Sequence, residues 1–226
     1  MTYCEPRKFF TLNSTLLGIL FLVLWFVFPV GGAIDMHFIQ PWMDASGQFP
    51  LKNNWFLVEI NHKLIKYIII AFYVSLLVTW LMSFKKEKLK PYTWRLGYFL
   101  CFSILSTAVV GVLKSHSAHA CPWSMTETTT IANTVSYVWN FSATNGHCFP
   151  GGHASTGFSL LTGYFVFRKS HQKLAYLFLF LGLTLGFLMG WGQMMRGAHF
   201  LSHNLWTGWV IYTFNLIMYH IFYNKI

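Results

Sequence analysis

The chain has 226 residues and a formal net charge of +10; 55% of its residues are hydrophobic and only 10% are charged. Its mean hydropathy is positive, at +0.47. This composition excludes an ordinary soluble fold, because a soluble domain needs a far larger charged share to cover its surface. The basic residues stand beside apolar runs, which indicates anionic lipid headgroups as their partners and not nucleic acid. No repeat, low-complexity tract or linker divides the sequence, so we expect one all-α membrane domain over residues 1–226.

Six segments are predicted to cross the membrane, since a helix needs about 20 mostly apolar residues to span the hydrocarbon core. They are, in chain order, Leu16–Ile34, Leu64–Phe84, Leu96–Leu113, His153–Phe167, Leu174–Met195 and Phe200–Phe222. The fourth is the weakest because it carries four hydroxyl side chains; it suits the middle of a bundle, with a re-entrant segment as the alternative. The first can also be read as a cleaved secretory signal, which would leave five spans and the same outward face.

Basic residues collect on one side when the six spans alternate. They precede the first span, fill the second and fourth connections, and close the chain (Arg7, Lys8, Lys85, Lys86, Lys88, Lys90, Arg95, Arg168, Lys169, Lys173, Lys225). Short cytoplasmic loops carry such an excess of Lys and Arg, so both termini are predicted to be cytoplasmic. Residues 35–63, residues 114–152 and the turn around Arg196 then face outward. The expected location is a bacterial inner (plasma) membrane, with the site facing the periplasm or the exterior.

Two of the four cysteines, Cys121 and Cys148, share one outer loop. In an oxidising compartment a disulfide between them would stabilise the fold by a few kcal/mol, and we predict this bond. Free thiols or metal ligands are the alternatives. Cys4 and Cys101 are expected to be reduced, small hydrophobic residues.

Histidines are concentrated on the predicted outer side. Six of them map there or just beneath it (His116, His119, His147, His153, His199, His203). Lys114 and Arg196 each stand at the membrane end of a span on the same side. Ionisable groups at a membrane edge are functional candidates.

Three outer segments carry these residues: Lys114–Trp123, Cys148–Ser155 and Gln193–His203. Together they resemble the type 2 phosphatidic acid phosphatase (PAP2) superfamily of membrane phosphatases. The pattern of that family is Lys, six residues and Arg-Pro; then Pro-Ser-Gly-His; then Ser-Arg, five residues, His, three residues and Asp. The resemblance covers the third to sixth helices, a motif-bearing core of about residues 96–222. It implies a phosphatase acting on a lipid phosphate monoester or pyrophosphate, such as lipid A, undecaprenyl pyrophosphate or phosphatidylglycerophosphate.

The resemblance also implies roles for individual residues. His199 is expected to be the nucleophile that forms a phosphohistidine, and His153 the general acid. Phosphoryl transfer needs cations and oriented N–H donors, which Lys114 and the backbone of Gly151 and Gly152 at a helix start are expected to supply. The expected partners are the lipid phosphate substrate and membrane lipids. We expect no cofactor and no metal, and the sequence does not indicate an oligomeric state.

Four positions depart from the family pattern: Cys121 and Gln193 stand for arginines, Gly151 for serine and His203 for aspartate. Arg196 follows Gln193 by three residues on one helix face, so its guanidinium can grip a phosphate instead. His203 follows His199 by four residues and can accept a hydrogen bond from its ring, which would fix the tautomer. Glu127 is a more distant candidate for that orienting role.

Two other kinds of protein are also compatible with these residues. The first is a metal-binding protein, because His199 and His203 are four residues apart and His116 and His119 are three apart. Carboxylates to support such ligands are scarce. The second is a non-catalytic membrane protein that binds lipid phosphate. Zinc content and phosphate release in the presence of a chelator would separate these readings from an active phosphatase.

Overall fold

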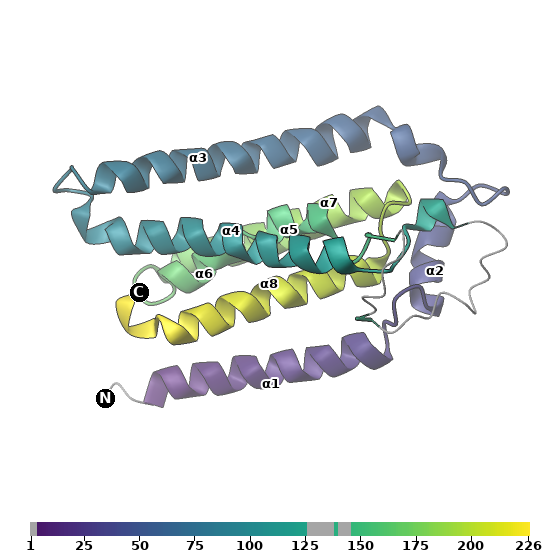
Figure 1. Ribbon diagram of the computed structural model, residues 1–226. Helices are drawn as coiled ribbons and strands as arrows, with labels where there is room; N and C mark the ends of the chain where they lie inside the picture. The colour runs from purple at the N-terminus through teal and green to yellow at the C-terminus, as the bar shows by residue number, and fades with distance from the viewer. Residues whose placement is uncertain (1–3, 126–137, 140–145) are drawn as a thin grey trace.

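The computed structural model describes residues 4–125, 138–139 and 146–226, and the regular elements of these residues are helical. The long helices run side by side along one axis (Figure 1). They are α1 (Cys4–Phe26), α3 (Ile65–Ser83), α4 (Thr93–His116), α5 (Gly152–Phe158) followed by α6 (Leu161–Phe167), α7 (Gln172–Met195) and α8 (Leu201–Ile221). A π-helix, η3 (Phe56–Leu64), leads into α3, and a short helix, α2 (Ala33–Ile39), lies across one end of the bundle. The predicted all-α fold is confirmed.

Short 3-10 turns lie between or after these helices. They are η1 (Gln40–Trp42), η2 (Pro50–Asn53), η4 (Lys90–Tyr92), η5 (Pro122–Ser124) and η7 (Tyr223–Lys225).

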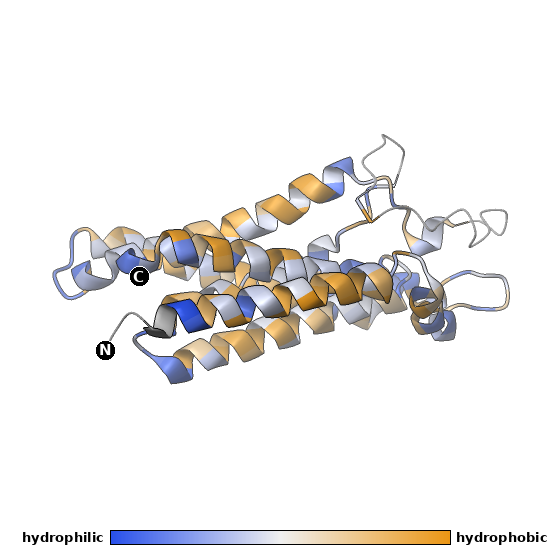
Figure 2. Ribbon diagram, turned by 90° about the horizontal axis from the view of Figure 1, so that it is seen from below, coloured by the Kyte–Doolittle hydropathy of each residue, from blue (hydrophilic) through white to orange (hydrophobic). Residues whose placement is uncertain are grey.

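Helices of membrane-spanning length and hydropathy are present in the described part of the chain. Four qualify: Arg7–Phe26, Phe56–Ser83, Lys90–His116 and Gln172–Met195. Apolar residues fill the middle of the bundle and hydrophilic residues gather toward its two ends (Figure 2). Both observations support an integral membrane protein.

Two of the predicted spans do not qualify by these criteria. The fourth is divided into α5 and α6. Near Leu160 the backbone hydrogen bonds join residues three apart in sequence and not four, as from the Leu160 N–H to the Gly157 carbonyl (3.2 Å). The sixth, α8, buries several polar side chains inside the bundle, which lowers its hydropathy (Ser202, His203, Asn204, Thr207, Asn215).

The first predicted span is shifted along the chain. It was expected to reach Ile34, but α1 ends at Phe26. Gly31 then has a φ of 71°, a left-handed conformation that glycine adopts readily, and α2 begins at Ala33 as a separate helix. The second span begins earlier than Leu64, because η3 adds residues 56–64 before α3.

The two chain ends lie at one end of the bundle and the predicted site segments at the other (Figure 1). The starts of α5 and α8, the ends of α4 and α7, and α2 all meet at that second end.

Glycines bring α5 and α6 close to α7. Gly182, Gly186 and Gly190 recur every four residues along α7 and are all buried, so they share one face. A Cβ added at Gly186 would collide with the ring of Phe158, and one added at Gly157 would collide with the backbone of Gly186. Small residues permit such close helix approach in membrane proteins. The approach fixes the start of α5 near the end of α7.

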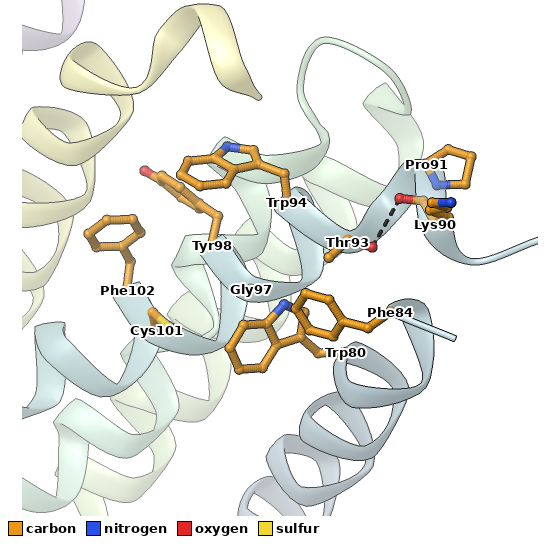
Figure 3. A pocket seen from close by; sticks show the side chains of 10 residues that line it. All are labelled: Trp80, Phe84, Lys90, Pro91, Thr93, Trp94, Gly97, Tyr98, Cys101 and Phe102. Carbon is orange, nitrogen blue, oxygen red and sulfur yellow. Dashed lines mark hydrogen bonds between the residues drawn. The ribbon is translucent and has the colours of Figure 1, made fainter. Parts of the chain in front are cut away.

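An apolar groove of about 640 Å³ lies between α3 and α4 at the other end of the bundle. Aromatic side chains line it, including Trp80, Trp94 and Phe102, with Lys90 at its edge (Figure 3). It lies near the chain ends, so it takes no part in the site built by the histidines.

Candidate active site

Three histidines come together at the junction of α5 and α8. His199 lies two residues before the start of α8 and His203 lies in its first turn; their exposed fractions are 2% and 0%. The two Nδ1 atoms are 3.3 Å apart, a hydrogen bond in which one ring must donate and the other accept. The ring of His153, in the first turn of α5, lies with its centroid 5.9 Å from that of His199. The expected pairing of His199 with His203 is therefore present in the structure.

Lys114 reaches the same place from the last turn of α4. A Cβ added at Gly152 would lie 3.4 Å from the Cδ atom of Lys114, so the lysine stem passes directly over the start of α5. The ammonium group is close enough to interact electrostatically with His199 and with His153. A fixed positive charge thus stands beside the histidines.

Gly151 plays a different part from the one expected. Its N–H donates to the Thr207 hydroxyl (2.8 Å) and to the His203 carbonyl (3.2 Å), so it is not free to bind a phosphate. These bonds join the start of α5 to α8. A Cβ at position 151 would also lie 2.7 Å from Oδ1 of Asn204, so a serine here would require the Asn204 side chain to shift.

Arg196 and Gln193 act as a pair at the end of α7. The Arg196 Nε atom donates to the Lys52 carbonyl (2.8 Å), and Nη1 donates to Oε1 of Gln193 (3.2 Å). Gln193 is 1% exposed, and its Nε2 atom has no hydrogen-bond partner among the described residues. Buried donors in a folded protein almost always find an acceptor, so this amide marks a place for one.

A disulfide joins Cys121 to Cys148, with their Cα atoms 5.2 Å apart, and the predicted bond is confirmed. Trp123, two residues after Cys121, donates its N–H to the Gly197 carbonyl (2.8 Å) in the turn between α7 and α8. The bridge therefore ties the segment after α4, the segment before α5 and the α7–α8 turn together around the histidines.

His199 lies outside the helices that cross the bundle, and burial lowers the pKa of its ring well below the ordinary value. The positive charge of Lys114 lowers it further. The ring is therefore neutral at neutral pH, which leaves a nitrogen lone pair available. A neutral imidazole is the form that can attack phosphorus.

Two residues near the site were missed in the sequence, and both come from the first third of the chain. Asp35 on α2 is 1% exposed and accepts hydrogen bonds from the N–H groups of Gly31 and Ser202 and from the Ser202 hydroxyl. His62 on η3 lies edge-to-face against His153, with ring centroids 4.2 Å apart. The available signal was weak: Asp35 is one of only six acidic residues and directly follows the first apolar run.

The other outer histidines contribute less. His116 is exposed and its Nδ1 atom contacts the Val112 carbonyl of its own helix. His119 is buried with its Nε2 atom 3.1 Å from the Val138 carbonyl, and its ring centroid is 6.4 Å from that of His203. Within the described ranges, no group of three or more His, Cys, Asp or Glu side chains is arranged to hold a metal ion. Glu127 lies outside the residues that the structure describes.

Comparison with protein families gives one match. The model of the PAP2 superfamily matches residues 95–226, which include all three motif segments and more than half of the chain. Neither curated proteins nor solved structures give a match. Asp35 and His62 both precede the matched region.

Proposed function

Because the chain belongs to the PAP2 superfamily, we propose that it hydrolyses a lipid phosphate at the histidine cluster through a phosphohistidine intermediate. Membership of this family supports phosphatase activity on phosphate esters. The observation that carries the finer proposal is the convergence of His199, His203 and His153 with Lys114 at one buried place.

His199 is the nucleophile in this proposal. In this proposal its Nδ1 atom donates to His203, which leaves the lone pair on Nε2 to attack phosphorus. The hydrogen bond holds the ring in one orientation, as the carboxylate of the family pattern is expected to do. The attack forms a P–N bond and breaks the bond from phosphorus to the leaving oxygen.

Positive charge next to the nucleophile stabilises the charge that develops on the transferring phosphoryl group. Lys114 supplies it over the start of α5. Arg196 and the free amide of Gln193 supply donors from the end of α7. This arrangement replaces the missing family arginines with a lysine, an oriented guanidinium and a buried amide.

His153 is the general acid. The negative charge of a bound phosphate favours the protonated form of its ring, which takes up a proton from the solvent when the substrate binds. The ring then gives this proton to the oxygen that leaves with the lipid. The neutral ring then accepts a proton from the water that cleaves the P–N bond, and inorganic phosphate is released. His153 and His199 are close enough for one bound phosphoryl group to lie between them.

The fold supports the location that we propose. The site lies at one end of a bundle of membrane-spanning length, where a lipid headgroup would stand. Positive residues at the opposite end favour a cytoplasmic position for the termini and an extracytoplasmic one for the site. A bacterial inner membrane suits this arrangement.

The test is phosphate release from purified lipid phosphates by the detergent-solubilised protein in the presence of a chelator. His199→Ala should lower turnover at least about a thousandfold, because no other group can form the covalent intermediate. His116→Ala, on the exposed end of α4, serves as the matched control and should keep its activity. Labelled wild-type protein should carry acid-labile phosphate that the His199→Ala protein lacks.

Three results would contradict the proposal. Near wild-type turnover by His199→Ala would exclude its role as nucleophile. Loss of activity with chelator and recovery with zinc would favour the metal-binding alternative. Binding of lipid phosphate without any release would favour the non-catalytic alternative.

A further inference from the structure

His62 lies against the residue that acts as general acid in the proposed function. The rings of His62 and His153 pack edge-to-face, with their centroids 4.2 Å apart and their planes at 89°. The ring of His199 is farther from His153, at 5.9 Å between centroids. His62 belongs to none of the three motif segments and precedes the region that the family model matches. Its contact with His153 therefore lies outside the family pattern.

The π-helix η3 holds His62 in this place. Single π turns occur frequently at functional sites. The side chain of Asn61, the residue before His62, donates from Nδ2 to the Leu188 carbonyl of α7 (3.0 Å). It also fills the space where a Cβ at Gly192 would lie. These contacts with α7 fix the backbone that carries His62, and its ring meets His153 at the start of α5.

One ring nitrogen of His153 is without a partner. Its Nδ1 atom is buried and makes no hydrogen bond to any of the residues that the structure describes. Such an atom is rare in a folded protein and marks a place for a donor or an acceptor. A neutral imidazole carries a proton on one nitrogen and a lone pair on the other. A proton that arrives at Nδ1 of His153 therefore leaves the proton on Nε2 free to go to the leaving oxygen.

The proposed reaction requires a proton to arrive there. The ring of His153 takes up a proton when the substrate binds and loses one when phosphate leaves, so a proton crosses between the solvent and this ring in both directions during each turnover. Burial keeps Nδ1 from exchanging its proton directly with bulk water. His62 is partly exposed and also touches His153, so it connects the solvent with the buried ring.

The other charged or titratable groups that face these two rings are less suited to carry a proton. They are Glu59, Lys63 and Lys66 on the same segment as His62, Arg196 on α7, Lys114 on α4 and His199 before α8. Lysine and arginine keep their protons at neutral pH. Glu59 is held in an ion pair with Lys63 (2.6 Å), and His199 is hydrogen-bonded to His203. Histidine is the side chain whose charge ordinarily changes near neutral pH, which leaves His62.

We propose that His62 relays protons between the solvent and His153. This inference rests on the proposed function and adds a proton path to it. His62 acts through His153 and does not touch the substrate. A turn of its side chain brings a ring nitrogen to Nδ1 of His153, and a partly exposed side chain makes such a turn within about nanoseconds.

The protons balance over one turnover. Protonated His62 gives its proton to Nδ1 of His153 and takes another from the solvent. His153 then gives the proton on Nε2 to the leaving oxygen, and Nε2 later accepts a proton from the water that cleaves the P–N bond. When phosphate leaves, Nδ1 returns its proton to His62 and so to the solvent. The sum is lipid phosphate plus water giving the dephosphorylated lipid plus phosphate.

Two substitutions of His62 separate proton transfer from packing. His62→Phe keeps a ring against His153 and removes the titrating nitrogens, whereas His62→Ala removes both. Each should lower kcat at least about tenfold, since general acid catalysis contributes about a hundredfold or more when its proton is supplied. Phosphate release from a lipid phosphate measures kcat. His116→Ala removes an exposed histidine at the end of α4; it is the matched control and should keep its kcat.

Imidazole added at fixed pH gives a readout that a packing role would not move. It should restore much of the kcat of His62→Ala, because it fits the space that the side chain left and can carry the proton. It should not restore His62→Phe, whose ring fills that space, and it should not change the wild type or His116→Ala. Wild-type kcat in His62→Phe, or a loss in His62→Ala that imidazole does not restore, would overturn the relay and leave the proposed function standing.

Proton uptake on binding tests the relay without turnover. A pH-indicator dye in weakly buffered solution records the uptake when detergent-solubilised protein is mixed with methylphosphonate, a phosphate analogue that is not cleaved. Wild-type protein should take up protons rapidly, and His62→Phe should do so much more slowly. Equal rates, or no uptake by the wild type, would overturn the relay. No phosphate release by the wild type would refute the proposed function, and the uptake rates would still decide on the relay.

Discussion

Arg196 stands three residues after the position where the family pattern has arginine, and its guanidinium is oriented from two directions. The backbone carbonyl of Lys52 holds Nε, and the side chain of Gln193 holds Nη1. The planar group keeps further N–H donors for a phosphate. In the proposed function, the glutamine at the family position is part of the replacement, because it orients the arginine that we propose takes over.

Arg196→Lys is expected to lower kcat/KM about ten- to a hundredfold, because an ammonium group cannot make both tethering bonds and still present a planar fork. Phosphate release from the preferred substrate measures the effect. Arg7→Lys, the same substitution on an exposed residue of α1, is the control and should keep its activity. Equal activity of Arg196→Lys and the wild type would show that only the charge at this position matters.

Sequence reasoning identifies those candidate site residues that belong to one of the three motif segments. His199, His153, Lys114 and the two cysteines were singled out this way, because their spacing relative to helix ends is local. The structure brings the first three together and joins the cysteines. Asp35 and His62 were not found, because tertiary packing alone brings them to the site. The function of Gly151 was also misjudged, since its N–H is used by Thr207, a partner 56 residues away.

Helix α8 depends on an element from the other end of the chain. The first N–H groups of a helix have no partner within it. Asp35 on α2 accepts a hydrogen bond from one of them, the backbone N–H of Ser202 (2.8 Å). The carboxylate also interacts favourably with the positive end of the helix. His199 and His203 flank Ser202, so this contact fixes the segment that carries both rings.

Burial raises the pKa of Asp35 to about 6, although the hydrogen bonds from Ser202 and Gly31 oppose the rise. The folded state therefore holds this proton more tightly than the unfolded chain, whose value is 3.8. The stability that this group contributes is complete below pH 3.8 and is lost as the pH rises to about 6. The loss is roughly 3 kcal/mol at most.

Asp35→Asn should remove this pH dependence. The unfolding free energy of the wild type, taken relative to that of the variant, should therefore fall by up to roughly 3 kcal/mol as the pH rises from about 4 to about 7. Chemical denaturation in detergent measures it. Asp44→Asn is the matched control: Asp44 is an exposed carboxylate whose pKa is lowered, chiefly by the Ser46 hydroxyl. Its contribution has the opposite sign and is lost as the pH falls. The same slope in both variants would contradict the assignment to Asp35.

The boundaries of the elements show where sequence reasoning is limited. Apolar runs predicted all the long helices, since burial in lipid requires them. The predicted ends of these helices were less accurate. The turn at Gly31, the π-helix η3 and the break between α5 and α6 depend on backbone hydrogen bonds that hydropathy does not report.

Over the whole molecule, charge and chemistry are separated along the bundle axis. The chain ends, the α3–α4 connection with its lysines and the α6–α7 connection lie at one end (Figure 1). The histidine cluster, the disulfide and α2 lie at the other. This separation agrees with the Lys and Arg distribution that the sequence shows, and it gives the orientation proposal a structural basis.

The orientation predicts the behaviour of reporters at both ends. A reporter fused after Ile226 should be active only in a cytoplasmic assay, because that end of the bundle carries the positive loops. A matched reporter inserted between Ser46 and Gly47 should be active only outside, since this exposed turn, closed by the Gly47 N–H to the Asp44 carbonyl (3.0 Å), lies in the loop that follows α2. Full phosphatase activity of both fusions would show that neither disturbs the fold. The reverse pattern would place the histidines in the cytoplasm. The substrate would then have to be a lipid phosphate of the inner leaflet, and Cys121 and Cys148 would stand in a compartment that reduces disulfides.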